Sequence, residues 1–226
     1  MLLGPRFTDA LRLANELHAG QTRKASNVPY LSHVLSVGAT VLEYGGDEDV
    51  AIAALLHDVV EDCGGLEIAE LIRNRFGTRV VDIVLGCSDT TEKPKPPWQE
   101  RNRRYLSHLP EAGPEVLLVS AADKLHNLQS LLREEGRLGK RLWNHFRAGR
   151  DGTLWYYERL LEIFRATLLP KELVDQIELH VTALRGRILA QQASDAQDSD
   201  NGVTVGSDPP DAAFSSVPPG VVVESK

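Results

Sequence analysis

Apolar residues recur every three or four positions over most of the chain, which is the spacing of amphipathic helices. The first such stretch places Phe7, Leu11 and Ala14 on one face. Helix start and stop signals divide the pattern, for example Pro29 before the second stretch and Gly45-Gly46 after it. The predicted helices cover residues 7–17, 30–44, 47–62, 66–76, 78–87, 99–109, 114–135, 138–147, 153–168 and 171–189. The pattern therefore predicts an all-α domain of about ten helices.

Interruptions of the pattern support this fold class. Residues 93–97 read Lys-Pro-Lys-Pro-Pro and are predicted to form a loop, because proline lacks the amide hydrogen of a helix interior and its ring clashes with the preceding turn. Strand signals are weak, since β-branched runs are short and no Asn-Gly or Asp-Gly turn lies between alternating segments. The chain shows no internal repeat.

Composition and charge limit the classes of protein to which the chain can belong. The 226 residues are 42% hydrophobic and 25% charged, which is the balance of a globular protein. No apolar run reaches the roughly 20 residues of a membrane-spanning helix, and none near the N-terminus has the length of a signal peptide. The net charge of −7 excludes a general footprint for nucleic acid or an anionic membrane. Cys63 and Cys87 lack metal-finger or redox spacing, which fits a reducing cytoplasm.

The charge is distributed unevenly along the chain. Residues 191–226 carry −5 of the net −7, are rich in Ser, Gly, Pro and Gln, and contain Phe214 as their one aromatic residue. Such a segment cannot bury enough apolar surface to offset the entropy lost when it becomes ordered. We therefore predict one helical domain over residues 1–190 and a disordered tail over residues 191–226.

The predicted helix over residues 47–62 ends in a group of ionisable side chains. His57 and Glu61 are four residues apart, as are Asp58 and Asp62, so each pair is expected on one face of the helix. Three carboxylates at this spacing repel one another, and they lie near the negative end of the helix dipole. A bound cation relieves that repulsion, so this segment predicts a metal site.

Further ligands for such an ion are available in other segments. His33 lies among apolar neighbours, where a histidine is either a ligand or a buried core residue. Asp123 lies in the middle of an apolar helix and needs a partner, because burial of an unpaired carboxylate is costly. If Asp123 has a structural role, its partner is Lys124; if it has a functional role, its partner is a metal ion. Asn127 lies one turn further along the same face of the helix. His126 is interpreted as a capping or packing residue. Two imidazoles and two carboxylates suit Mn, Fe, Mg or Zn.

A basic cluster precedes the second predicted helix. The segment from His18 to Lys24 ends the first helix and enters a loop. Its ordinary interpretation is cationic capping of the helix C-terminus, which contributes only a few tenths of a kcal/mol. Its functional interpretation is a clamp for an anion or nucleotide, because the Arg23 guanidinium offers both a planar fork for phosphate and a flat face for a base.

His33, His57, Asp58 and Asp123 resemble the ligand set of the HD-domain metal-dependent phosphohydrolases. The surrounding motifs resemble the hydrolase domain of RelA/SpoT homologues over about residues 7–165. These motifs are His18…Gln21-Thr22-Arg23-Lys24…Pro29-Tyr30…His33, Leu55-Leu56-His57-Asp58-Val59-Val60-Glu61-Asp62 and Ala122-Asp123-Lys124-Leu125-His126-Asn127. The small alarmone hydrolases, which consist of this domain alone, are the closer resemblance, because the chain enters its polar tail near residue 191.

The resemblance implies an HD-domain helical bundle that removes pyrophosphate from the 3′ position of ppGpp and pppGpp, using Mn²⁺ in the cytoplasm. It implies that the four residues of the ligand set bind the ion, and that Glu61 and Asp62 position or deprotonate the attacking water. It also implies nucleotide contacts from Arg23 on the guanine, Lys24 on phosphate, and Asn127, Arg150 and Tyr156 in the pocket.

Two alternatives are left open by the sequence. One is an HD phosphohydrolase of another nucleotide, such as ppApp, NADPH or a dNTP, because an arginine stacks on any base. The other is a regulatory or antitoxin-type binding module on the same fold, which the presence of all four ligands and both acidic residues disfavours. A small-molecule nucleotide is the expected partner, with no nucleic acid and no membrane, and the oligomeric state is left open.

Overall fold

The structure, a computed structural model, describes residues 3–90, 92 and 94–200 of the chain. These residues form helices without a β-strand, and one isolated bridge pairs Thr22 with Pro29. The elements in chain order are α1 (Pro5–Leu17), α2 (Leu31–Glu43), α3 (Glu48–Leu56), η1 (Val60–Gly64), α4 (Leu66–Phe76), α5 (Thr78–Cys87), α6 (Trp98–His108), η2 (Leu109–Glu111), α7 (Pro114–Leu138), η3 (Gly139–His145), α8 (Gly149–Arg165) and α9 (Lys171–Asp200). The prediction of an all-α fold of about ten helices is confirmed.

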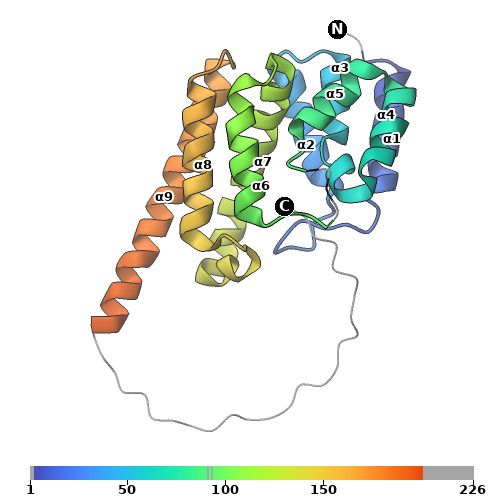
Figure 1. The fold of residues 1–226 in the computed structure, drawn as a ribbon. Coiled ribbons are helices and arrows are strands. Elements are labelled where there is room, and N and C mark those ends of the chain that lie inside the picture. Colours follow the sequence, from blue (N-terminus) through green and yellow to red (C-terminus); the bar gives the residue numbers. More distant parts are fainter. Residues whose placement is uncertain (1–2, 91, 93, 201–226) are drawn as a thin grey trace, which may run out of the picture.

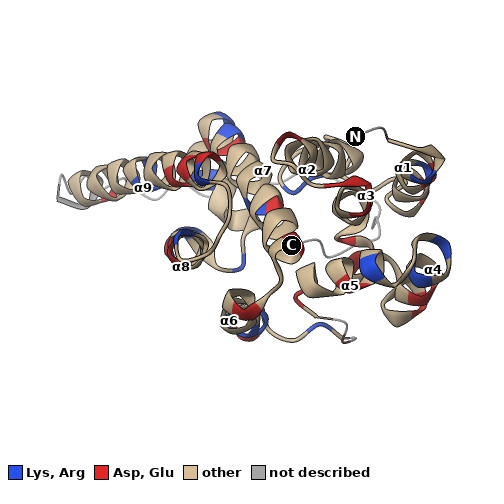
Figure 2. Ribbon diagram, turned by 90° about the horizontal axis from the view of Figure 1, so that it is seen from above, with Lys and Arg blue, Asp and Glu red and all other residues tan. Residues whose placement is uncertain are grey.

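Two hydrophobic cores lie on different faces of α7, which runs through the middle of the molecule (Figure 1 and Figure 2). The first core is formed by α1 to α5 and receives Val119 and Ala122 from α7. The second core is formed mainly by α6, α8 and α9 and receives Ala121, Leu125 and Leu128 from α7. A single helix therefore packs against both halves of the protein. Acidic and basic residues are interspersed along the helices in Figure 2.

Helix ends follow the local sequence signals in the first half. The Asp47 side chain accepts a hydrogen bond from the Val50 amide at 3.1 Å and caps α3. Gly77 separates α4 from α5 with a φ of +94°, a conformation that a residue with a Cβ rarely adopts. None of the described helices combines the length and the apolar character needed to cross a membrane.

The prediction of one continuous helix over residues 47–62 is wrong at its C-terminal end. α3 ends at Leu56, His57 and Asp58 form a turn, and Val60–Gly64 form the π-helical turn η1. A π-turn contains more residues than an α-turn and therefore shifts the side chains that follow it. Glu61 lies within this turn, and its carboxylate contacts Arg101 of α6, a contact that the four-residue spacing did not indicate.

The boundary of the folded part also differs from the prediction. α9 extends to Asp200, past the predicted boundary at residue 190, and its end runs beyond α8 in Figure 1. The Gln191 side chain is buried, accepts a hydrogen bond from Trp143 Nε1 at 2.9 Å and donates one to Glu135 Oε1 at 2.6 Å. Periodicity of apolar residues ends before this segment, so its polar contacts left no signal in the pattern.

The charged residues of this extension contact the preceding segments as well. Asp195, which the charge count placed in a disordered tail, pairs with Lys140 of η3 and Arg150 of α8. Residues 201–226 of the predicted tail lie outside the described residues, as does Lys93 of the predicted loop. Residues 94–97 of that loop are not helical, in agreement with its prolines.

Candidate metal centre and adjoining cavity

The four predicted metal ligands come from three distant segments and meet in one place. His33 lies on α2, His57 and Asp58 lie on the turn after α3, and Asp123 lies on α7. All four are buried, with exposed fractions of 0% to 3%. Two carboxylates this deeply buried require compensating charge or hydrogen bonds, because an unpaired buried charge is very unfavourable.

The donor atoms of these side chains lie close to one another. His57 Nε2 lies 2.9 Å from Asp58 Oδ2 and 3.7 Å from Asp123 Oδ1. His33 Nε2 lies 3.6 Å and 3.2 Å from the same two oxygens. Ligand atoms that lie about 2.1 Å from one ion are about 3.0 to 3.5 Å apart in octahedral or tetrahedral arrangements. His33, His57 and Asp58 therefore present donor atoms close enough to one another to hold one metal ion, and Asp123 Oδ1 lies beside both imidazoles.

Hydrogen bonds behind the two imidazoles orient their Nε2 atoms toward this point. His57 Nδ1 donates to the Ala54 carbonyl at 2.8 Å, and His33 Nδ1 lies 2.7 Å from His126 Nδ1. Neither Nε2 atom forms a hydrogen bond within the described part of the chain, although both are buried. Buried nitrogen atoms in this state are typical of metal ligands whose other ring nitrogen is held by the protein.

Hydrogen bonds from three side chains orient the two carboxylates. The Tyr30 hydroxyl donates to Asp58 Oδ2 at 2.5 Å. Asp123 accepts from Lys124 Nζ at 2.6 Å through Oδ2 and from Asn127 Nδ2 at 2.5 Å through Oδ1. Although burial acts in the opposite direction, the Lys124 ammonium and the two imidazoles hold the pKa of Asp123 well below its usual range. Lys124 is thus a partner of Asp123, as expected for a structural role, but the Asp123 Oδ1 atom still faces His33 and His57.

The titration of the imidazoles follows from the same surroundings. Burial opposes protonation of His57, but the carboxylates of Asp58 and Asp123 raise its pKa to about 10. A proton and a metal cation therefore compete for the space between these groups. Burial, with the neighbouring His33 imidazole and the Arg23 guanidinium, lowers the pKa of His126 to about 3, so the His126 ring is neutral at physiological pH.

A second acidic pair lies beside the four ligands. Lys95 Nζ donates to Glu61 Oε1 at 3.2 Å and to Asp62 Oδ1 at 2.9 Å, and Arg101 Nη1 donates to Glu61 Oε1 at 3.1 Å. Burial and the charge of Asp58 raise the pKa of Asp62. The two carboxylates thus differ, since Glu61 contacts two cationic side chains and Asp62 contacts one of them.

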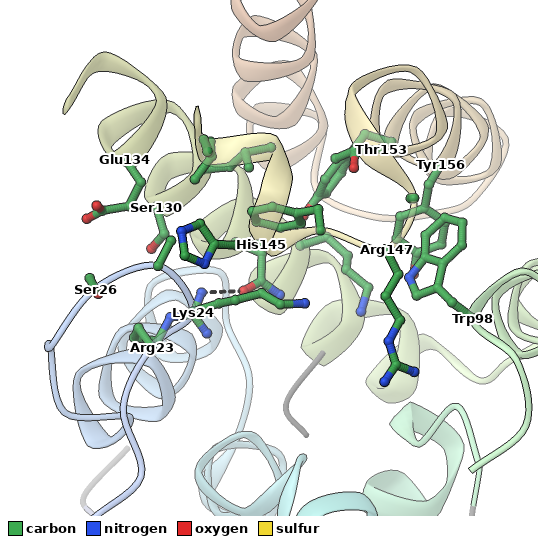
Figure 3. A pocket seen from close by; sticks show the side chains of 18 of the residues that line it. Arg23, Lys24, Ser26, Trp98, Ser130, Glu134, His145, Arg147, Thr153 and Tyr156 are labelled. Atoms are coloured by element: carbon green, nitrogen blue, oxygen red, sulfur yellow. Dashed lines mark hydrogen bonds between the residues drawn. The ribbon is translucent and has the colours of Figure 1, made fainter. Parts of the chain in front are cut away.

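The structure contains a cavity of about 650 Å³, which Figure 3 shows from close by. Tyr30, Lys124 and Asn127, which bond the aspartate ligands, form part of its wall. Its size lies within the usual range of small-molecule sites. Among the described residues, its wall contains two carboxylates, Asp89 and Glu134, and seven basic side chains, namely Arg23, Lys24, Lys95, Arg101, Lys124, Arg133 and Arg147. The cavity is therefore basic although the chain is acidic, which favours an anionic ligand.

The structure brings four of the five predicted nucleotide contacts to this cavity. Arg23, Lys24, Asn127 and Tyr156 all line it. Arg150 is not part of the lining that the described residues form, and its guanidinium instead pairs with Asp151 and Asp195. Asp151 belongs to α8 itself, and Asp195 belongs to the extension of α9 that the apolar pattern did not predict.

Two sides of the cavity differ in chemistry (Figure 3). On one side, Arg23 Nη2 donates to Asn127 Oδ1 at 2.6 Å, and Lys24 Nζ lies 4.9 Å from the centre of the Phe146 ring. Across from them lie Trp98 and Tyr156, whose ring centres are 5.9 Å apart in an edge-on arrangement. Flat aromatic and guanidinium surfaces of this kind can hold a base while the basic groups hold phosphate.

Sequence reasoning missed three side chains of the site. Lys95 and Arg101 contact the acidic pair, and His126 contacts His33. The positive charges near residues 95–104 were the one available signal for the first two, since unpaired acidic residues elsewhere require basic partners. His126 lies three residues after Asp123, so helical spacing places it on a neighbouring face of the same helix.

The geometry of two histidines and two aspartates beside a basic cavity agrees with the sequence family that the chain matches. Residues 10–154, more than half of the chain, match the HD domain. The chain belongs to the HD-domain family. This HD-domain protein is 38% identical over 143 residues to the guanosine-3′,5′-bis(diphosphate) 3′-pyrophosphohydrolase MESH1 of Xenopus tropicalis, covering 61% of this chain and 77% of that protein.

Longer bacterial proteins and solved structures are also similar to this HD-domain protein. It is 32% identical over 129 residues to the bifunctional (p)ppGpp synthase/hydrolase SpoT of Escherichia coli K12, covering 56% of this chain but 18% of that protein. A solved metazoan ortholog of SpoT that hydrolyses ppGpp matches with a TM-score of 0.65 and 27% identity, over 83% of this chain and 98% of that one. The Listeria monocytogenes EGD-e protein lmo0812 matches with a TM-score of 0.59 and 30% identity, over 70% of this chain and 99% of that one.

Proposed function

We propose that this HD-domain protein removes pyrophosphate from the 3′ position of guanosine alarmones, so that ppGpp yields GDP and pppGpp yields GTP. The observation that carries the proposal is the convergence of His33, His57, Asp58 and Asp123 beside a basic cavity. The names of the MESH1 and SpoT relatives support the substrate class. A ligand with two groups of phosphates matches a cavity whose wall is mostly basic.

We assign the metal site to the same four residues, with Mn²⁺ as the ion that the resemblance implies. A divalent ion bound there supplies Lewis-acid polarisation of a phosphate oxygen and lowers the pKa of a bound water by several units. Tyr30 and Lys124 hold the aspartate oxygens in place through their hydrogen bonds. The pairing of the imidazole Nδ1 atoms with other groups leaves the Nε2 atoms for the ion.

The acidic pair beside the ligands takes the proton of the attacking water in this proposal. Asp62 is the better proton acceptor, because its pKa is raised by burial and by Asp58. Glu61 is held by Arg101 and Lys95, so its carboxylate is suited to orienting the water rather than binding its proton. General-base assistance of this kind typically contributes about 10²–10⁴-fold to the rate.

The remaining cavity residues bind the nucleotide. Arg23 Cζ lies over the Tyr30 ring, 5.5 Å from its centre, and the guanidinium can stack on the base. Lys24 and Arg147 provide charge for the phosphates, and Asn127 and Tyr156 complete the wall. Arg150 takes no part in this proposal, because its guanidinium pairs with acidic residues away from the cavity.

The test is hydrolysis of ppGpp, ppApp, NADPH and dGTP by the purified full chain with Mn²⁺, followed by chromatography of the nucleotide that remains and of the products. We expect ppGpp to be turned over fastest. Asp58→Ala should lose both bound metal, measured by elemental analysis, and turnover. Asp62→Asn should retain the metal and lose at least about 10²-fold in kcat. Full activity of Asp58→Ala would refute the site, and faster turnover of another nucleotide would refute the substrate.

A binding module without catalysis is the outcome if wild-type protein binds ppGpp but releases no pyrophosphate with any divalent metal.

We also propose that the protein is located in the cytoplasm. Among the described residues, Cys63 and Cys87 form no disulfide, which is the expected state in a reducing compartment. Fractionation of cells that express the chain with an epitope tag checks this assignment.

A further inference from the structure

We infer that His126 is a positioning residue that fixes which ring nitrogen of His33 carries the proton, and so makes His33 a metal ligand. This inference rests on the proposed metal site. It concerns a residue that the sequence pattern treated as capping or packing. His126 lies on α7, and its Nδ1 atom is 2.7 Å from Nδ1 of His33 on α2.

The second histidine ligand shows how a tautomer is normally fixed. His57 Nδ1 lies 2.8 Å from the Ala54 carbonyl oxygen, which can only accept a hydrogen bond. The proton of the neutral His57 ring must therefore be on Nδ1. Its Nε2 atom then carries the lone pair that a metal ion requires.

His33 has no carbonyl oxygen in that role, because its Nδ1 partner is another imidazole. A hydrogen bond between two ring nitrogens needs one donor and one acceptor, so a single proton lies between them. If His126 donates, the neutral His33 ring carries its proton on Nε2 and cannot bind a metal there. If His33 donates, its Nε2 lone pair faces Asp58 and Asp123, at 3.6 Å and 3.2 Å. Only the second arrangement is compatible with a ligand, and it places the His126 proton on Nε2.

Within the part of the chain that the structure describes, packing makes His126 the hydrogen-bond partner of His33 Nδ1. The His33 side chain is 0% exposed, so bulk water does not reach its ring. The two rings are 4.9 Å apart between centres and tilted by 36°, which brings their Nδ1 atoms together. His126 is three residues from Asp123, so the helix that supplies an aspartate ligand also supplies the partner of a histidine ligand.

The test compares His126→Leu with His126→Asn in the full chain. Leucine fills similar space without an acceptor, whereas asparagine can present Oδ1 near the position of the histidine Nδ1. We expect His126→Leu to weaken Mn²⁺ binding about 10- to 100-fold in isothermal titration calorimetry, the usual effect of losing such a partner. His126→Asn should bind within about threefold of wild type. His108→Leu, at an exposed position on α6, is the matched control and should leave the affinity unchanged.

A second readout observes the protons directly. Long-range ¹H–¹⁵N correlation spectra of the Zn²⁺-loaded protein, with diamagnetic zinc in place of manganese, should show His33 protonated on Nδ1 and His126 protonated on Nε2. Wild-type affinity in His126→Leu, or a proton on His126 Nδ1, would overturn the inference while leaving the proposed function intact. If wild-type protein binds no divalent ion, the metal site and the role of His126 fail together.

Discussion

Substitution of Gln191 by alanine tests whether the end of α9 supports the wall of the cavity. The change removes two hydrogen bonds of a buried side chain, one from Trp143 and one to the Glu135 carboxylate. A neutral hydrogen bond contributes about 1 kcal/mol and one to a charged group about 2 kcal/mol, so we expect a loss of about 3 kcal/mol. For a chain of this length, that loss lowers the melting temperature by roughly 6 to 12 °C.

The expected effect on activity follows from the position of Trp143. It belongs to η3, whose Leu142 and His145 line the cavity. Loosening this segment should raise KM for the nucleotide and leave the Mn²⁺ affinity unchanged, because the metal ligands lie on other elements.

The assays for this prediction are differential scanning calorimetry and steady-state kinetics. Gln197→Ala, at an exposed position further along α9, is the matched control and should change neither quantity. A melting temperature within about 2 °C of wild type for Gln191→Ala would refute the reasoning, since it would show that the end of α9 contributes little to the stability of η3.

Two further predictions concern the buried charges of the site. Arg101→Leu should destabilise the protein by about 3 kcal/mol in urea denaturation, because it removes a cationic partner of the buried Glu61 carboxylate. The double variant Arg101→Leu/Glu61→Leu should recover most of that loss, and equal instability of both would contradict the pairing. Chelation of the metal should lower the melting temperature in calorimetry, since an ion at 100 times its Kd stabilises the fold by about 2.7 kcal/mol. An unchanged melting temperature after EDTA treatment would argue against a bound ion.

Local sequence signals were sufficient for most of the helices and for the residues that converge in the site. Burial of His33 and Asp123 followed from their apolar neighbours, and the concentration of charge at His57 and Asp58 indicated a cation. These arguments need only helical periodicity and the energetic penalty of buried charge. They therefore identified side chains that the fold brings together from three segments, although the chemical roles of these side chains stay predictions.

Pairings between distant polar residues were not predictable in the same way. Lys95 contacts Glu61 across 34 positions of sequence, and Gln191 contacts Glu135 across 56. Periodicity describes how one helix faces its surroundings but does not specify which polar side chains meet. The π-turn η1 was not predictable from periodicity either, because one additional residue per turn leaves the apolar pattern almost unchanged.

The position of α7 has a consequence for how the protein folds. Its residues complete both hydrophobic cores, and it also carries Asp123, whereas the other three ligands belong to the half formed by α1 to α5. The ligand set is therefore complete only after α7 has docked, and docking of α7 also organises the second half. Metal uptake during refolding should consequently be a late event, and a bound ion should slow the separation of the two halves and make their unfolding more concerted.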